Sequence, residues 1–134
     1  MSLFSLEGKV VLVTGASRGI GKAVAEKLVA MGAKVAGTAT SESGAANISE
    51  YLGDNGKGYA LNVTDGDSVA AVLSAIKEDL GDIDILVNNA GIVGPTAPVE
   101  EVTVEDWQRT LDVCINSQFY FTKAAVPVFK NQGS

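Results

Sequence analysis

The sequence contains no histidine and a single cysteine, Cys114, and each shortage excludes a class of protein. Histidine is the commonest metal ligand and the usual general base at neutral pH. Its absence excludes a Ser-His-Asp hydrolase and a structural zinc site within this chain. One cysteine permits no internal disulfide bond. We therefore expect neither a metal site nor a disulfide framework.

Positive charge and long apolar runs are also scarce. Ten Lys and Arg stand against 16 Asp and Glu, which gives a net charge of −6 at pH 7. Such a chain offers no basic surface to the phosphates of a nucleic acid. No apolar run approaches the roughly 20 residues that cross a bilayer, and the opening residues lack the order of a signal peptide. We expect a cytoplasmic protein without nucleic-acid or membrane partners.

The sequence instead alternates short β-branched runs with longer segments of helical period, and Gly, Asn or Asp stands at the joins. With 134 residues, 46% of them apolar, the chain fits a single domain at residues 1–134. The alternation predicts βα units on a parallel sheet, an α/β fold of Rossmann type with helices on both faces. Strands are expected at residues 9–13, 33–39, 59–63 and 83–87, in the order 3-2-1-4.

Four helices are expected because apolar residues recur at steps of three and four. The last should run from about residue 104 toward Pro127, with Thr103 and Asp106 as its cap, and Thr64 with Asp67 should cap the third. The predicted buried faces are Ile20, Ala23, Val24, Leu28 and Met31 in the first helix; Ala45, Ile48, Tyr51 and Leu52 in the second; Val69, Val72, Leu73, Ile76 and Leu80 in the third; and Trp107, Leu111, Ile115 and Phe119 in the last.

The strongest local pattern is T-G-A-S-R-G-I-G at residues 14–21, where the first predicted strand ends and a helix begins. Gly15, Gly19 and Gly21 suit a nucleotide pyrophosphate: one allows a tight turn, one lets the backbone approach the ligand, and one permits close packing of helix on strand. The helix N-terminus offers free N–H groups and a positive dipole end. Glycine-rich turns can also serve only close packing. The place of this turn in the first of several βα units favours a nucleotide site.

Charge at the end of the second strand indicates which dinucleotide is bound. An NAD-specific site usually places a carboxylate there, against the ribose 2′-hydroxyl, and residues 37–41 supply none. Arg18 in the turn can donate a charge-assisted bond to a 2′-phosphate. We therefore expect NADP(H), with the alternative that Arg18 is only a solvated loop charge.

Two motifs together, TGASRGIG at residues 14–21 and NNAG at residues 88–91, resemble the short-chain dehydrogenase/reductase superfamily. Residues 8–92 look most like the bacterial 3-oxoacyl-acyl-carrier-protein reductases of fatty-acid biosynthesis. The later segment is more similar to other members, so a mosaic of two relatives stays open.

The resemblance implies NADP(H) as the cofactor. It implies that Asn62 and Val63 lie beside the adenine, and that Asn89, Ala90 and Gly91 lie beside the ribose and nicotinamide. The predicted dinucleotide-binding residues are Gly15, Ser17, Arg18, Gly19, Ile20, Gly21 and Thr38; Asn62 and Val63; and Asn89, Ala90 and Gly91.

The same resemblance identifies what the chain lacks for catalysis. Members of the superfamily use a serine and a Tyr-x-x-x-Lys pair, usually with an asparagine on the preceding helix. No Tyr-x-x-x-Lys occurs here, and Cys114 takes the position of the asparagine. Cysteine lacks the paired donor and acceptor of an amide, and without an activating neighbour it is interpreted as a small buried apolar residue. No catalytic residue is predicted.

These expectations describe half of a complete short-chain reductase fold, a truncated chain that binds NADP(H) but is inactive alone. An acyl-carrier-protein substrate is expected only for a full-length relative. The fourth strand would be a sheet edge, so we expect a homo-oligomer formed through that strand, the last helix or both. Two alternatives stay open: an engineered or chimeric assembly unit with vestigial nucleotide binding, and an active enzyme of which this sequence is only a part.

Overall fold

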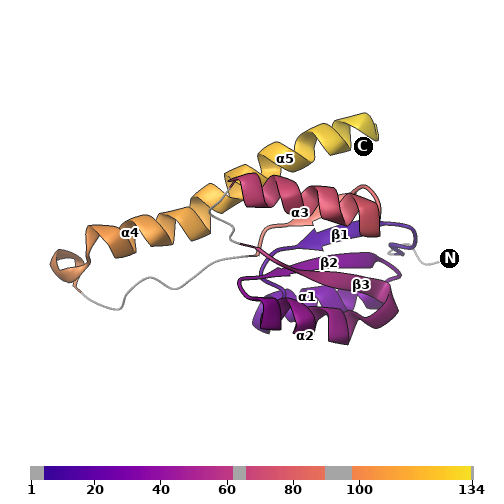
Figure 1. Ribbon diagram of the computed structural model, residues 1–134, viewed down its shortest axis with the longest axis horizontal. Coiled ribbons are helices and arrows are strands. Elements are labelled where there is room, and N and C mark those ends of the chain that lie inside the picture. The colour runs from indigo at the N-terminus through magenta and orange to yellow at the C-terminus, as the bar shows by residue number, and fades with distance from the viewer. Residues whose placement is uncertain (1–4, 62–65, 90–97, 134) are drawn as a thin grey trace.

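Four parallel strands form one sheet in the computed structural model, which describes residues 5–61, 66–89 and 98–133. The strands are β1 (Val10–Val13), β2 (Lys34–Ala39), β3 (Gly56–Ala60) and β4 (Ile85–Val87), in the order β3-β2-β1-β4. The predicted Rossmann-type order 3-2-1-4 is confirmed. Helices α1 (Gly19–Ala30) and α2 (Glu42–Leu52) cover one face, and α3 (Gly66–Asp79) and α5 (Ser117–Asn131) cover the other (Figure 1).

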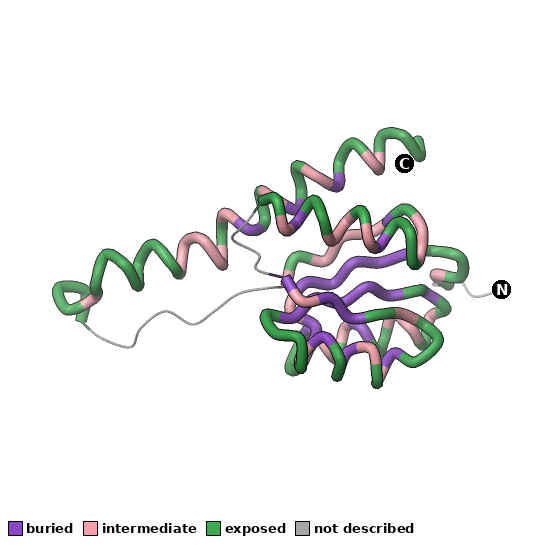
Figure 2. Tube along the Cα trace, in the orientation of Figure 1, coloured by how far each residue is buried: buried purple, intermediate pink, exposed green. Residues whose placement is uncertain are grey.

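The core lies on both faces of β1, whose four residues are all buried. Side chains alternate between the faces of a strand. Val11 and Val13 accordingly pack in a cluster with Ile48 of α2, and Leu12 packs in a second cluster with Phe121 of α5. Figure 2 shows the buried strands between two helical layers that are exposed on their outer sides. This double cover explains why β1 is a continuous apolar run.

The third strand begins earlier than predicted. β3 pairs with β2 from Gly56 opposite Val35 to Ala60 opposite Ala39, whereas the sequence indicated residues 59–63, of which 62 and 63 lie outside the described part of the chain. A short 3-10 helix, η1 (Gly53–Asn55), precedes it. The glycines fit this strand because α2 packs closely here: a Cβ on Gly58 would overlap the carbonyl oxygen of Ala45.

The predicted buried face of the first helix is wrong at its N-terminal end. Ile20 is 75% exposed, and Ala23 is also exposed. The buried positions are Gly21 and Ala25, with Val24 partly buried beside them. Ile20 and Ala23 therefore lie on the face of α1 that is turned to solvent, whereas Gly21 and Ala25 lie on the face that packs against the core.

The last predicted helix is divided into three consecutive segments: α4 (Val104–Leu111), a π-helical turn, η3 (Asp112–Asn116), and α5. A 3-10 turn, η2 (Val99–Glu101), comes before them. The predicted cap of α4 is confirmed, since the Asp106 amide donates to Thr103 Oγ1 at 3.0 Å. The expected stop at Pro127 is wrong, because α5 continues to Asn131. Pro127 is exposed, so water can reach the carbonyl that loses its helical partner. Thr64, the other predicted cap, lies outside the described residues.

The buried face predicted for this helix is also wrong. Trp107, Ile115 and Phe119 are 59%, 58% and 61% exposed. The covered face of α5 carries Phe121 and Ala125 instead, packed over the sheet. Figure 1 shows the reason: α5 crosses beside α3, whereas α4 extends past the end of the sheet, where none of the described helices and strands lies beneath it. We refer to α4, η3 and the first three residues of α5, residues 104–119, as the helical arm.

Candidate functional site

The glycine-rich turn, residues 14–21, joins β1 to α1 at the carboxyl end of the sheet. Gly15 and Gly19 have φ of +67° and +62°, the left-handed region that side-chain-bearing residues avoid. A Cβ on Gly19 would meet nothing within 4 Å, whereas one on Gly21 would overlap the carbonyl oxygen of Gly15 and lie 2.6 Å from Asn89 Nδ2. Gly15 therefore makes the turn, Gly19 leaves open backbone, and Gly21 permits close packing.

Hydrogen bonds hold the turn from beneath. The amides of Gly15 and Ala16 donate to Thr38, at 3.2 Å to Oγ1 and 2.9 Å to the carbonyl oxygen. Asn89 adds a second support from beyond β4: its Nδ2 donates to the carbonyl of Gly15 at 3.1 Å, and its amide donates to Thr14 Oγ1 at 2.9 Å. Thr38 is 1% exposed. Thr38 and Asn89, both predicted site residues, thus fix the shape of the turn.

The outer side of the turn carries unpaired donors. Among residues 5–61, 66–89 and 98–133, the amides of Ser17, Ile20 and Gly21 have no hydrogen-bond acceptor. The amide of Lys22 is the first that bonds back, to Arg18 at 3.3 Å. These donors stand at the N-terminus of a 12-residue helix, where the dipole adds positive potential. The arrangement can bind an anion such as a pyrophosphate.

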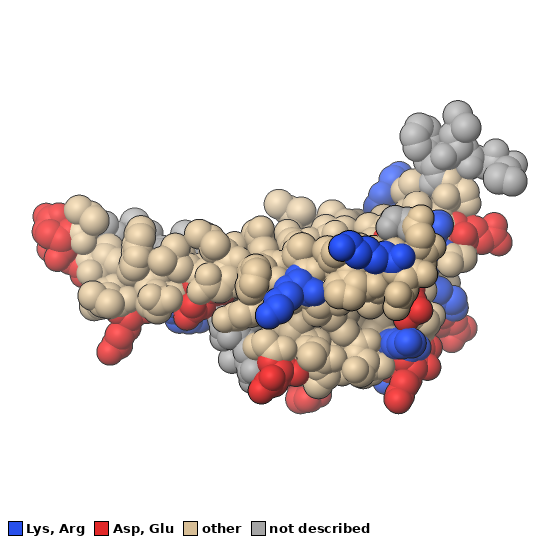
Figure 3. Space-filling model, turned by 90° about the horizontal axis from the view of Figure 1, so that it is seen from above, with Lys and Arg blue, Asp and Glu red and all other residues tan. Residues whose placement is uncertain are grey.

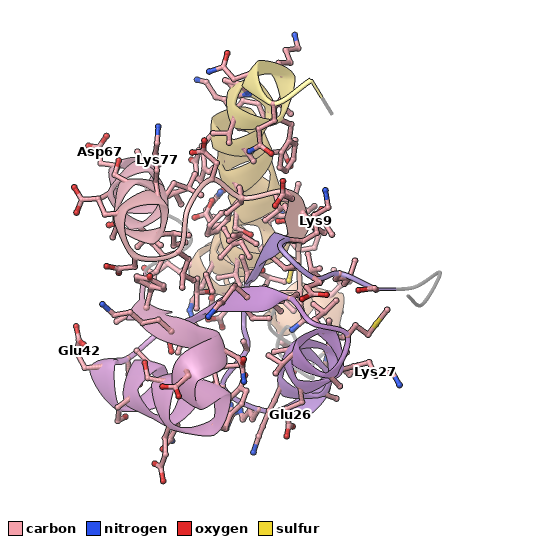
Figure 4. All side chains as sticks on the ribbon, turned by 90° about the vertical axis from the view of Figure 1, so that its right-hand side faces the viewer. Lys9, Glu26, Lys27, Glu42, Asp67 and Lys77 are labelled. Carbon is pink, nitrogen blue, oxygen red and sulfur yellow. The ribbon has the colours of Figure 1, made fainter. Side chains whose placement is uncertain are left out.

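Arg18 is exposed beside these amides and has extended backbone dihedrals at the start of α1. The end of β2 opposite carries Ala39, Thr40 and Ser41, of which Thr40 and Ser41 are exposed and none is charged. The next residue, Glu42, opens α2, and Figure 4 shows its side chain pointing outward, away from α1. The guanidinium is therefore the charged group that this edge of the turn offers to a ligand.

Tyr51 is a contact of the turn that the sequence did not reveal as one. It was predicted only as part of the buried face of the second helix, where it does lie beside buried Ile48 and Leu52. Its hydroxyl also donates to the carbonyl of Ala16 at 2.6 Å. A phenol on a core-facing helix surface needs a hydrogen-bond partner. That requirement was the available signal, but the sequence did not identify the partner.

Several predicted positions cannot be placed. Asn62, Val63, Ala90 and Gly91 lie outside the described residues, so their roles stay predictions. The structure does bring together the others, Gly15, Ser17, Arg18, Gly19, Ile20, Gly21, Thr38 and Asn89, at one end of the sheet.

Cys114 lies in the π-helical turn as a half-buried cysteine, less covered than the buried residue that we expected. Its neighbour Asp112 accepts hydrogen bonds from Gln108 Nε2 at 3.1 Å and Asn116 Nδ2 at 2.7 Å. These bonds run along the helix and satisfy its polar side chains locally. π-helical turns occur often at functional sites.

A sequence model described as short chain dehydrogenase matches residues 9–134. The chain belongs to the short-chain dehydrogenase family. Its 3-oxoacyl-acyl-carrier-protein reductase relatives, each named FabG, include one from Vibrio cholerae, 57% identical over 122 residues, and one from Escherichia coli, 52% identical over 122 residues. Each alignment covers 91% of this chain and 50% of the relative.

The fold of this short-chain dehydrogenase chain matches a solved member. The crystal structure of 2-keto-3-deoxy-D-gluconate dehydrogenase from Streptococcus agalactiae superposes with a TM-score of 0.83 at 37% identity, covering 97% of this chain and 50% of the other. The chain thus spans about half the length of the relatives it matches. Within the described residues, no helix is long and apolar enough to cross a membrane, and no three His, Cys, Asp or Glu residues form a metal-binding group.

Proposed function

We propose that the chain binds NADP(H) across the glycine-rich turn, with the pyrophosphate against the amides of Ile20 and Gly21. The observation that carries the proposal is the pairing pattern of the turn: its inner polar groups are bonded to Thr38 and Asn89, while its outer amides have no acceptor in the described chain. Because these hydrogen bonds already fix the turn, it loses little conformational entropy when it binds an anion. Membership of a dehydrogenase family supports a dinucleotide as that anion.

The preference for NADP(H) over NAD(H) rests on charge. Arg18 is exposed at the turn, and residues 39–41 at the end of β2 carry no carboxylate that would repel a 2′-phosphate. A guanidinium binds phosphate through charge-assisted, often bidentate hydrogen bonds. Asn62, Val63, Ala90 and Gly91 complete the proposed site at the adenine, ribose and nicotinamide.

The reaction proposed for the whole protein is hydride transfer from NADPH to the ketone of a 3-oxoacyl group on acyl-carrier protein, as the names of the relatives suggest. These 134 residues contain no Tyr-x-x-x-Lys pair. Bound cofactor would supply the hydride, and the residues that protonate the product would have to come from elsewhere. The chain by itself is therefore expected to bind nucleotide without turnover, and a cytoplasmic location stays a prediction.

Titration calorimetry with NADP⁺ and NAD⁺ on protein of verified mass tests the binding proposal. We expect both to bind, with NADP⁺ tighter. An assay of NADPH oxidation with a 3-oxoacyl thioester on the same sample should show no turnover. Absence of heat with both nucleotides would contradict the proposal, and turnover would contradict the expected inactivity.

We also propose that the chain self-associates through the helical arm. Trp107, Ile115 and Phe119 expose more than half of their surface there, and Figure 3 shows one face of the arm as mostly uncharged, with acidic residues at its tip and along one edge. Exposed apolar patches of this kind mark interaction sites. The edge strand β4 was the other predicted contact, but its three residues are already half-buried. The helical arm is therefore the stronger candidate for contact with a second copy.

A further inference from the structure

One peptide of the glycine-rich turn depends on a helix that lies outside the turn. The peptide between Gly15 and Ala16 is held at both ends, by Asn89 Nδ2 on its carbonyl and by the Thr38 carbonyl on its N–H. The next peptide, between Ala16 and Ser17, has a single hydrogen bond among the described residues, from the hydroxyl of Tyr51 to the Ala16 carbonyl at 2.6 Å. Its orientation therefore depends on Tyr51.

The hydrogen bond from Tyr51 to the Ala16 carbonyl also fixes the direction of the Ser17 amide, because both groups belong to one peptide. A trans peptide is planar, and its C=O and N–H point in opposite directions. Because Tyr51 holds the Ala16 carbonyl on the α2 side, the Ser17 amide points away from α2, toward the outer side of the turn. The chain then passes through Arg18 in an extended conformation, with φ −162° and ψ 175°, directly into α1. A rotated peptide would displace the Ser17 amide and the Arg18 side chain together.

The surroundings keep Tyr51 in place and keep its hydroxyl a donor. Lys22 Nζ lies 5.2 Å from the centre of the ring, on the α1 side. Burial raises the pKa of Tyr51 to about 12, and the charge of Glu26 on α1 adds to the rise. The phenol thus stays protonated throughout the neutral range. Ala16 has no exposed surface. A Cβ on Gly37 of β2 would lie only 2.9 Å from the Ala16 methyl, so Ala16 is tightly packed against β2.

We propose that Tyr51 is a positioning residue for cofactor recognition: its hydroxyl sets the orientation of the peptide between Ala16 and Ser17, and so directs the Ser17 amide and Arg18 toward the 2′-phosphate end of NADP(H). The inference rests on the proposed function, because it assigns the ligand that Ser17 and Arg18 face. It makes the second helix, α2, a determinant of nucleotide preference.

The test is Tyr51→Phe, which removes one hydroxyl and keeps the ring. Loss of a hydrogen bond of this kind should weaken NADP⁺ binding about three- to tenfold, measured by calorimetry. NAD⁺, which lacks the 2′-phosphate, should weaken about twofold or less, so that the ratio of the two affinities falls. A role confined to stability would lower both equally.

Tyr59→Phe is the matched control. The Tyr59 hydroxyl also donates a single hydrogen bond, to Asp79 Oδ2 at 2.9 Å, but it joins β3 to α3 away from the turn. Its pKa is also raised, chiefly by burial, so both variants remove a similarly sheltered phenol. Tyr59→Phe should leave the ratio of NADP⁺ to NAD⁺ affinity unchanged. An equal change of that ratio in both variants would overturn the inference.

A double-mutant cycle that combines Tyr51→Phe with Arg18→Ala tests whether Tyr51 acts on NADP⁺ binding through Arg18. Coupled residues give non-additive losses, so Tyr51→Phe should weaken NADP⁺ binding less when Arg18 is already absent. Full additivity would contradict positioning through Arg18. Unchanged NADP⁺ binding by Tyr51→Phe would overturn this inference and leave the proposed function intact, whereas a wild-type chain that bound neither nucleotide would overturn both.

Discussion

The glycine-rich turn and the helical arm differ in the kind of groups that they expose to solvent. In the turn, buried Thr38 and partly buried Asn89 and Tyr51 bond the inner backbone groups, and the exposed groups are polar amides. In the arm, backbone groups are satisfied within the helix, and the exposed side chains include large apolar ones, among them Trp107 and Phe119, beside charged residues. A rigid polar surface suits a small anion, whereas an apolar helical surface suits another protein surface.

The largest expected effect separates the sheet from the arm. Phe121, 1% exposed, and Phe119, 61% exposed, stand two residues apart on α5. Phe121→Ala should lower the free energy of unfolding by about 3–5 kcal/mol because it leaves a cavity over the sheet. Phe119→Ala should change it by about 0.5 kcal/mol or less in dilute protein. Urea unfolding of both variants checks this, and equal losses would show that the arm is packed as firmly as the core.

The next effect concerns the open backbone of the turn. Gly19→Asp adds a side chain at φ +62° and a negative charge where the pyrophosphate should bind, so the Kd for NADP⁺ should rise at least about a hundredfold, or ~2.7 kcal/mol. Gly53→Asp is the control. Gly53 also has a positive φ, +56°, and equally open space, so this variant likewise adds a side chain at a strained position and a negative charge, but at the end of α2. If the two variants bound NADP⁺ equally well, the turn would not be the phosphate site.

The arm is tested by placing a charge on its apolar face. Ile115→Glu should weaken self-association about thirtyfold, or ~2 kcal/mol, because association would bury an unpaired carboxylate in place of an aliphatic side chain. Ala46→Glu introduces the same charge at an exposed position of α2 and should leave association unchanged. Sedimentation velocity over a range of concentrations gives the comparison. A wild-type chain that stayed monomeric at high concentration would contradict the proposed contact.

The smallest expected effect is the choice of nucleotide. Arg18→Ala should weaken NADP⁺ binding about tenfold and NAD⁺ binding about twofold or less, since only NADP⁺ carries the 2′-phosphate. Lys27→Ala removes the same charge from the far end of α1, where Figure 4 shows Lys27 projecting outward, and should change neither affinity appreciably. Equal weakening of both nucleotides by Arg18→Ala would mean that Arg18 supplies only general positive potential.

Regular features of the chain were predictable because they depend on local patterns. The alternation of apolar runs and helical periods gave the parallel order 3-2-1-4, and the three glycines indicated a turn at the end of β1. The cap of α4 at Thr103 follows from sequence spacing alone and is confirmed. Each of these features is decided by residues close together along the chain or by the fixed geometry of βα units.

Features that depend on distant residues were not predictable. Apolar spacing in the arm correctly indicated a helix, but it could not show that the sheet ends before Trp107 and Ile115. The strand start at Gly56 depends on how closely α2 approaches β3. The contact between Tyr51 and Ala16 joins residues 35 positions apart in sequence, and no local pattern specifies it. These long-range choices decide which apolar and polar groups are left for partners.

The central claim is that the amides on the outer side of the glycine-rich turn bind a pyrophosphate, and a crystal structure with NADP⁺ tests it most directly. We predict pyrophosphate oxygens within hydrogen-bond distance, about 3 Å, of the Ile20 and Gly21 amides, and the 2′-phosphate beside Arg18. A pyrophosphate bound elsewhere on the chain, or a turn whose amides point away from it, would contradict the account.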